Sequence, residues 1–599
     1  MSFLHDPSQR PNDNCLASAG AVVMDTPFVT RAAAMRLPAQ IAVALMSLAV
    51  VWTLGMGVIT LRRRAHSLPI VFNWRSNLNI AGWWPMVVSV ALTVLVLIAS
   101  KTGWLQVELA DVVATVLPPL VAIQAAWLLS PEDEPALEVI MACPRELKWV
   151  LLERLSLLLI VQGGVALALS PLAAAWTGES FVLTVVRWLA PLVLLCGLAV
   201  CVTLVARRAV MGVVVTGLVW FAANLLGDAM VNRWPFAWPL HLYLSPDHAE
   251  YALNRCFIFL LGIVLILLAA SRLLRDSERV LLGSRKLPSR QVLGRRTPSR
   301  DVSVASDHSS FVVRHASLTQ LGAMLRYEFL LQWRRPTLLA LMGGLIAVPI
   351  LGAFLSKGQF SGYDTAIAAG GLMLEQVRAQ ITASMLTAVW LGVSMTLLLL
   401  LPIVTADAIP GDRQVGVREL LDSLPIAPGT YLAGKLLSLW VSLLAGLGLV
   451  ALAAGIAWRW IVGPFNLGIY AEMWLLGAVP LALINSALSV LLAAGQPTNR
   501  RAIFVGVGFA IFCLLALLPG ILTHGTLLYH LNPARPAIEL YYSVAWPGAE
   551  AGASKDLLGI IQVVRTITSR QDVLLSIAAG MAEVGLVWLV DLQWMRRKG

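Results

Sequence analysis

Residues 337–355 read TLLALMGGLIAVPILGAFL, an unbroken apolar stretch without a charged side chain. A stretch of about this length can cross the roughly 30 Å hydrocarbon core of a bilayer as one helix. Similar stretches lie at about 38–61, 81–100, 110–130, 150–176, 181–206, 209–229, 255–273, 381–406, 432–460, 471–495, 502–523 and 573–594. Because a backbone in lipid must satisfy its own hydrogen bonds, the pattern predicts an all-α integral membrane protein with about thirteen transmembrane helices.

The composition of the 599-residue chain supports this class. Hydrophobic residues make up 58% and charged residues 13%, about half the charged fraction of a soluble domain, which excludes an ordinary soluble enzyme. The sequence has no GxxxxGK[ST] phosphate-binding motif and no HExxH metal motif. We therefore expect no catalytic site, no metal and no cofactor bound by this chain.

Basic residues in the loops predict the orientation. The clusters are Arg62 to Arg64 with Arg75, Arg207 with Arg208, Arg334 with Arg335, Arg500 with Arg501, and Arg596 to Lys598. All fall on one side if the spans alternate, and the positive-inside rule assigns that side to the cytoplasm. An odd span count then places the N-terminus outside and the C-terminus inside, in a multi-pass protein of the cell (inner or cytoplasmic) membrane.

Three pairs of segments recur in the same order and predict an internal duplication. VFNWRSNLNIAGWW (71–84) aligns with LLQWRRPTLLALMG (330–343), residues 131–155 align with 412–436, and RRAVMGVVV (207–215) aligns with RRAIFVGVG (500–508). The prediction is two six-span units in parallel orientation, 65–273 and 318–599. Residues 1–64 form an N-terminal segment with one extra transmembrane helix.

Residues 274–317 are polar and basic and are predicted to form a cytoplasmic linker between the two units. The composition favours a flexible tether near anionic lipid over an RNA-binding or regulatory segment. We expect no nucleic-acid partner.

A short amphipathic helix is predicted in the cytoplasmic loop after the second span of each unit. In the second unit Val417, Leu420 and Leu424 recur at helical spacing, and Pro425 ends the helix. In the first unit Glu138, Pro144 and Arg154 stand at one constant offset from Glu419, Pro425 and Lys435. The apolar stripe of such a helix could lie on the protein's own helices, on the bilayer surface or on a partner.

The stretch DRQVGVRELLDSLPIAPGTYLAGKLLSLW, from residue 412, resembles the cytoplasmic coupling segment in the membrane domain of type-two ABC (ATP-binding cassette) exporters. RYEFLLQWRRP (326–336) is similar to the interfacial elbow helix of that family. The resemblance implies that this chain is the permease subunit and supplies both halves of the translocation pathway. It also implies a separate ATPase subunit in two copies, holding ATP and Mg, that docks around 132–144 and 413–425.

The residues that the resemblance assigns to docking are Glu138, Pro144, Arg145, Arg154, Arg418, Glu419, Pro425 and Lys435; those of the elbow helices are Trp74, Arg75, Trp333 and Arg334. As single residues, the charged members could equally be solvated loop charges. The first unit departs from the family pattern because it lacks the glycine before the coupling helix and has Arg154 where the second has Lys435.

Aromatic and proline-rich segments precede the last span of each unit, at 230–254 and 524–570. They are predicted to form either an outer gate, which the resemblance implies, or an interfacial aromatic belt. The scarcity of charge in the spans favours a lipophilic or amphiphilic substrate such as a drug, antibiotic or lipid. An ion-coupled secondary transporter is the alternative function, with Glu583 as the deepest carboxylate.

Overall fold

The computed structural model describes residues 86–87, 89–94, 98, 109–128, 130, 147–273, 322, 325–360, 374–414, 428–515, 532–533 and 570–598. Within these residues the chain forms helices and connecting turns and no strand. The all-α prediction is therefore confirmed for this part of the chain.

The elements begin and end at the following residues. The first group comprises α4 (Leu109–Ala126), α6 (Leu147–Thr177), α7 (Phe181–Ala206), α8 (Ala209–Arg233), the 3-10 helix η2 (Pro235–Leu240), α9 (Tyr251–Leu268) and the π-helix η3 (Ala269–Leu273). The second comprises α12 (Pro336–Phe360), α14 (Leu374–Val389), the π-helix η5 (Trp390–Ser394), α15 (Met395–Thr405), α16 (Pro410–Gln414), α18 (Pro428–Ile461), α19 (Leu467–Glu472), the π-helix η6 (Met473–Ala478), α20 (Val479–Ala494), α21 (Asn499–Leu515) and α25 (Arg570–Lys598).

Nine helical segments within the described residues are long and apolar enough to cross a membrane, which indicates a multi-pass membrane protein. The predicted span at 38–61 lies outside the described residues, and only part of 81–100 is described. The apolar part of α4, Val113–Ala126, is shorter than the other spans. The count of thirteen therefore stays a prediction.

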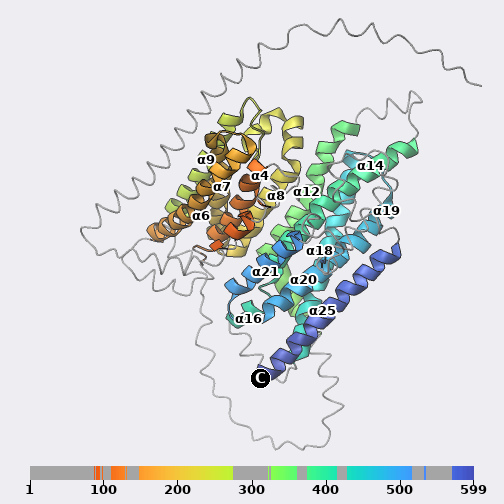
Figure 1. The fold of residues 1–599 in the computed structure, drawn as a ribbon. Coiled ribbons are helices and arrows are strands. Elements are labelled where there is room, and N and C mark those ends of the chain that lie inside the picture. Colours follow the sequence, from red (N-terminus) through yellow and green to blue (C-terminus); the bar gives the residue numbers. More distant parts are fainter. Residues whose placement is uncertain are drawn as a thin grey trace, which may run out of the picture.

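The helices lie in two groups along the chain order, one from α4 to α9 and the other from α12 to α25 (Figure 1). The two groups meet where α8 contacts α12 and α15. One apolar cluster extends through both groups, from Leu117 on α4 to Leu488 on α20. The groups fall within the predicted units 65–273 and 318–599, whose relation by duplication stays a prediction.

Glycines allow the close approach at this boundary. A Cβ atom added to Gly344 of α12 would lie 2.5 Å from Leu218 Cδ1 of α8, and one added to Gly217 of α8 would lie 2.7 Å from Leu400 Cδ2 of α15. Helices in lipid associate through such close van der Waals packing at small residues, because lipid tails are as apolar as the side chains.

Candidate functional site

A buried cluster of charges joins three elements of the second group, and we call it the Lys435 cluster. Lys435 Nζ on α18 lies 2.7 Å from Glu328 Oε1 and 2.7 Å from Asp412 Oδ2. The exposed fraction is 1% for the lysine side chain, 7% for the glutamate and 10% for the aspartate. The Tyr431 hydroxyl donates a hydrogen bond of 2.7 Å to Asp412 Oδ2. All four side chains of the cluster are therefore withdrawn from water.

Local sequence explains how these side chains meet. Tyr431 and Lys435 are four residues apart on α18 and so share one face of the helix. Asp412 lies in the first turn of α16, which begins at Pro410, a residue suited to a helix start. Glu328 belongs to helical residues 325–334, which we call the elbow helix, and this helix ends just before α12 begins at Pro336.

Burying the charges of the cluster costs desolvation free energy. Removing an ammonium and a carboxylate from water costs several kcal/mol for each ion, which their mutual attraction offsets only in good geometry. Lys435 Nζ lies close enough to both carboxylates for ion pairing. The angles at these contacts do not meet hydrogen-bond geometry. We assign the contacts as ion pairs on the basis of these short distances. One ammonium therefore holds two carboxylates together.

Further polar contacts tie the same region to its neighbours. Arg335 Nη1, at the junction of the elbow helix and α12, lies 3.4 Å from Asp407 Oδ1. Arg413 Nη1 of α16 donates a hydrogen bond of 2.8 Å to the carbonyl of Gln496, in the turn between α20 and α21. The elbow helix, α16, α18 and the α20–α21 turn are therefore connected at one end of the second group.

The corresponding cation of the first group is also buried. Arg154 on α6 is 2% exposed, and its Nη1 donates a hydrogen bond of 2.6 Å to the carbonyl of Leu128, just after α4. In the alignment of the two loops Arg154 stands opposite Lys435, and Pro131 stands opposite Asp412. Each cation thus connects the first turns of a long helix to residues that precede that helix. Arg154 of α6 contacts the backbone carbonyl of Leu128, and Lys435 of α18 contacts the carboxylate of Asp412 in α16.

Most of the predicted docking and elbow residues lie outside the described residues: Trp74, Arg75, Glu138, Pro144, Arg145, Arg418, Glu419 and Pro425. Trp333 and Arg334 occupy the last turn of the elbow helix, where Arg334 is exposed and Trp333 is half-buried beside Phe329 at a ring-centroid distance of 6.1 Å. Lys435 and Arg154, which were also predicted to take part in docking, are both buried. The contacts described above are therefore made within the chain.

Glu328, Asp412 and Tyr431 were not predicted from the sequence as site residues. Glu328 and Asp412 stand in the quoted elbow and coupling stretches. A lysine in the second turn of a helix that is expected to enter lipid requires a partner, and this requirement is the signal that could have prompted a search for carboxylates nearby.

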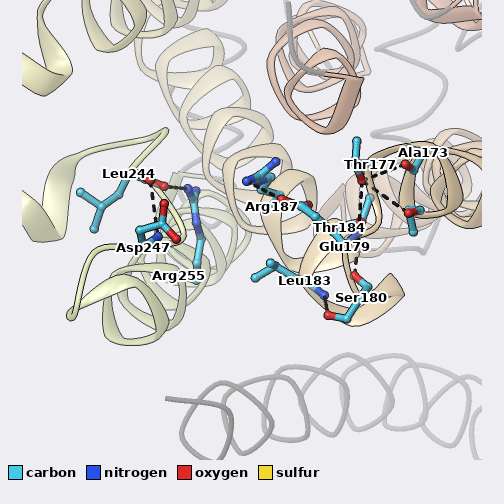
Figure 2. Close-up of polar contacts among 12 residues, drawn as sticks. Ala173, Thr177, Glu179, Ser180, Leu183, Thr184, Arg187, Leu244, Asp247 and Arg255 are labelled. Atoms are coloured by element: carbon cyan, nitrogen blue, oxygen red, sulfur yellow. Dashed lines mark hydrogen bonds and ion pairs between the residues drawn. The ribbon is translucent and has the colours of Figure 1, made fainter. Parts of the chain in front are cut away.

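A second set of polar contacts lies at the α6–α7 turn and the start of α9 (Figure 2). Arg187 Nη2 on α7 forms an ion pair of 3.0 Å with Glu179 Oε1 in the turn after α6. Arg255, near the start of α9, is 1% exposed and donates hydrogen bonds to the carbonyls of Leu242 and Leu244. The segment 230–254, predicted to form an outer gate or an aromatic belt, thus contains the 3-10 helix η2 and is bonded to α9 through Arg255.

Replacing Arg255 by Met is expected to loosen this segment and to lower the free energy of unfolding by about 2 kcal/mol, because two buried carbonyls lose a charged donor. Thermal unfolding and limited proteolysis in detergent would measure the effect. Arg233→Met on the exposed face of α8 is the matched control and should change neither measurement. Equal effects of the two substitutions would contradict the assigned role of Arg255.

Comparisons with known proteins do not assign the chain to a family. No protein-family model, no curated protein and no solved structure matches it. Among the described residues, no group of three or more His, Cys, Asp or Glu side chains could hold a metal ion.

Proposed function

We propose that this chain is the membrane subunit of an ATP-driven exporter that moves a lipophilic or amphiphilic substrate out of the cytoplasm. A separate ATPase subunit in two copies supplies the energy. ATP binding draws the two copies together, each copy pulls on one cytoplasmic loop, and the two groups of helices rock to open the outer side. The basic residues of the loops support a cytoplasmic position for the Lys435 cluster.

The observation that supports this proposal best is the position of the Lys435 cluster. The predicted docking stretch 413–425 begins at the end of α16 and precedes α18, and the cluster joins those two helices to each other and to the elbow helix. A displacement of the loop by a partner would therefore act on several spans together. In this proposal buried Lys435 and Arg154 take part in docking by positioning the loops, and residues of the loops themselves make the contact.

Low charge within the spans supports the proposed substrate class. Residues 209–227 and 337–355 contain no charged side chain, and residues 181–206 contain only Arg187. A pathway between such helices offers few polar groups to replace the water shell of an inorganic ion. The apolar surface of a lipophilic substrate, in contrast, can pack against the apolar side chains of the helices.

Reversing the charge of both proposed docking residues, Glu138→Lys with Glu419→Lys, is expected to weaken copurification of the ATPase subunit about tenfold and to reduce ATP-driven export in proportion. Like charges placed in a contact oppose association and reduce the affinity of the wrong partner. Coexpression of tagged chain with the ATPase subunit, followed by pull-down and vesicle transport, would measure both effects.

Asp247→Lys, on the exposed segment before α9, reverses one carboxylate charge, as each member of the double variant does, and is the control. If the double variant binds the ATPase subunit and supports export like the parent chain, the docking assignment is wrong. Export driven by an ion gradient in vesicles that lack the ATPase subunit would replace the proposal with ion-coupled secondary transport.

A further inference from the structure

Two π-helices interrupt neighbouring spans of the second group. η5 has the sequence WLGVS between α14 and α15, and η6 has the sequence MWLLGA between α19 and α20. The two elements contact each other. A π-helix inside an α-helical span widens one turn, and such insertions occur frequently at functional sites.

A small cavity lies between these two elements. Its volume is about 10 Å³, and its lining includes Val393 and Ser394 of η5, Met473 and Trp474 of η6, and Tyr470 of α19. This volume admits the centre of one water-sized group, and a water molecule is retained in such a cavity only when it finds two to four polar partners.

Three polar side chains of the lining provide complementary hydrogen-bonding capacity. Trp474 is 5% exposed, and its indole N–H interacts with the Tyr470 hydroxyl without reaching hydrogen-bond geometry. The Tyr470 hydroxyl donates a hydrogen bond of 2.6 Å to the carbonyl of Ala451, so its oxygen still has lone pairs to accept. Ser394, 6% exposed, carries a hydroxyl that can donate or accept.

An acceptor stabilises a buried indole N–H, and two fully buried indoles of the described residues have one, whereas Trp127 has none. The indole nitrogens of Trp188 and Trp458 donate to Ser170 Oγ and to the carbonyl of Pro349, each at 3.0 Å. Leaving such a donor buried without a hydrogen bond costs about 1–3 kcal/mol. A group that accepts from Trp474 and donates to Tyr470 would remove this cost.

We propose that the cavity between η5 and η6 binds one hydroxyl oxygen, which accepts hydrogen bonds from the Trp474 indole and the Ser394 hydroxyl and donates one to the Tyr470 oxygen. Water and an alcohol group on an apolar chain share this chemistry. The alcohol source rests on the proposed export of an amphiphilic substrate, and water can occupy the site whatever the function.

The position of η5 links the cavity to the boundary between the two groups of helices. A Cβ atom added to Gly392 of η5 would lie 2.6 Å from Val348 Cγ1 of α12 and 3.8 Å from Leu225 Cδ2 of α8. The π-helix thus has the cavity on one side and the boundary on another. An occupant that alters η5 acts directly on the packing between the groups.

Fluorine NMR of the full chain labelled with 5-fluorotryptophan in lipid nanodiscs tests the site without transport or an ATPase subunit. The chain has 21 tryptophans, so the conservative Trp474→Phe substitution identifies the resonance of Trp474 by its loss. The probes are 1-octanol, n-octane at equal membrane content, and exchange of H2O for D2O. We expect the Trp474 resonance to shift with octanol and not with octane.

Ser394→Ala removes one polar partner and is expected to weaken the response to octanol about fivefold, as the loss of one hydrogen bond predicts. Ser442→Ala, a buried serine of α18 that bonds within its own helix to the Ser438 carbonyl, is the control and should leave the response unchanged.

A response to D2O without a response to octanol would support the site with water as its occupant. A Trp474 resonance that responds to neither octanol nor D2O would overturn the proposal. Loss of ATP-driven export would leave this NMR result untouched, so failure of the proposed function and failure of the site are separable.

Discussion

Substitution of Lys435 by Met is expected to lower the free energy of unfolding by about 3–5 kcal/mol, because removal of one partner leaves the other buried charges uncompensated. Two carboxylates, Glu328 and Asp412, depend on this single ammonium, and each lies 2.7 Å from it. The chain should show a lower unfolding temperature and a lower yield of monodisperse protein in detergent. A thermal unfolding series with size-exclusion analysis would measure both.

Two further variants separate the cluster from a general effect of losing a basic residue. Arg334→Met removes an exposed cation from the end of the elbow helix and should leave the unfolding temperature nearly unchanged. Lys435→Met combined with Glu328→Gln and Asp412→Asn should recover much of the loss, because the buried side chains are then neutral. A combined variant as unstable as Lys435→Met alone would contradict the ion-pair explanation.

The second large effect is expected at the crossing of α7 and α9. A Cβ atom added to Gly262 of α9 would lie 2.6 Å from the backbone nitrogen of Leu194, and one added to Gly197 of α7 would lie 2.6 Å from the carbonyl oxygen of Gly262. Because these neighbours are backbone atoms, a rotamer change cannot relieve the contact. Gly262→Ala must separate the two helices, at a cost of about 3 kcal/mol, the upper end for overpacking. Thermal unfolding of the purified chain would detect it.

Gly163→Ala provides the matched control for this prediction. Gly163 is an interior residue of α6, and an added Cβ would meet no atom of the described residues within 4 Å outside its own stretch of helix backbone. Alanine should be neutral there or stabilise the helix by about 0.5–1 kcal/mol, since glycine loses more backbone entropy in a helix. A destabilisation of equal size at Gly163 and Gly262 would mean that the α7–α9 contact is not the cause.

Apolar length predicted most of the fold, because the constraint that lipid imposes on the backbone acts on long stretches and tolerates single exceptions. The predicted stretch 181–206 corresponds to α7 even though Arg187 lies within it, since the ion pair with Glu179 accommodates that charge. The π-helices could not be predicted in this way. The hydropathy of WLGVS is the same whether the segment forms an α-helix or a π-helix. Which of the two helices forms depends on the tertiary packing around Gly392.

The candidate site was only partly accessible from the sequence. Lys435 was among the residues that the resemblance assigned to docking, and its buried partners were missed. Glu328 is 107 residues away along the chain, so pairing the two requires knowledge of how the elbow helix packs on α18. Asp412 and Tyr431 are closer to Lys435 in sequence. From the sequence alone, however, Asp412 could be an exposed loop residue and Tyr431 could lie at the membrane interface, so neither is predicted to pair with the lysine.

The π-helices also bear on the stoichiometry of the proposed site between η5 and η6. Within the described residues of the first group, α4 and α7 continue as α-helices from Leu109 to Ala126 and from Phe181 to Ala206, without the widened turns of η5 and η6. An assembly of two identical halves must present its sites in pairs. Because the two groups of this chain differ here, occupancy at the η5–η6 cavity follows a stoichiometry of one ligand per chain, and its binding curve should be that of a single independent site.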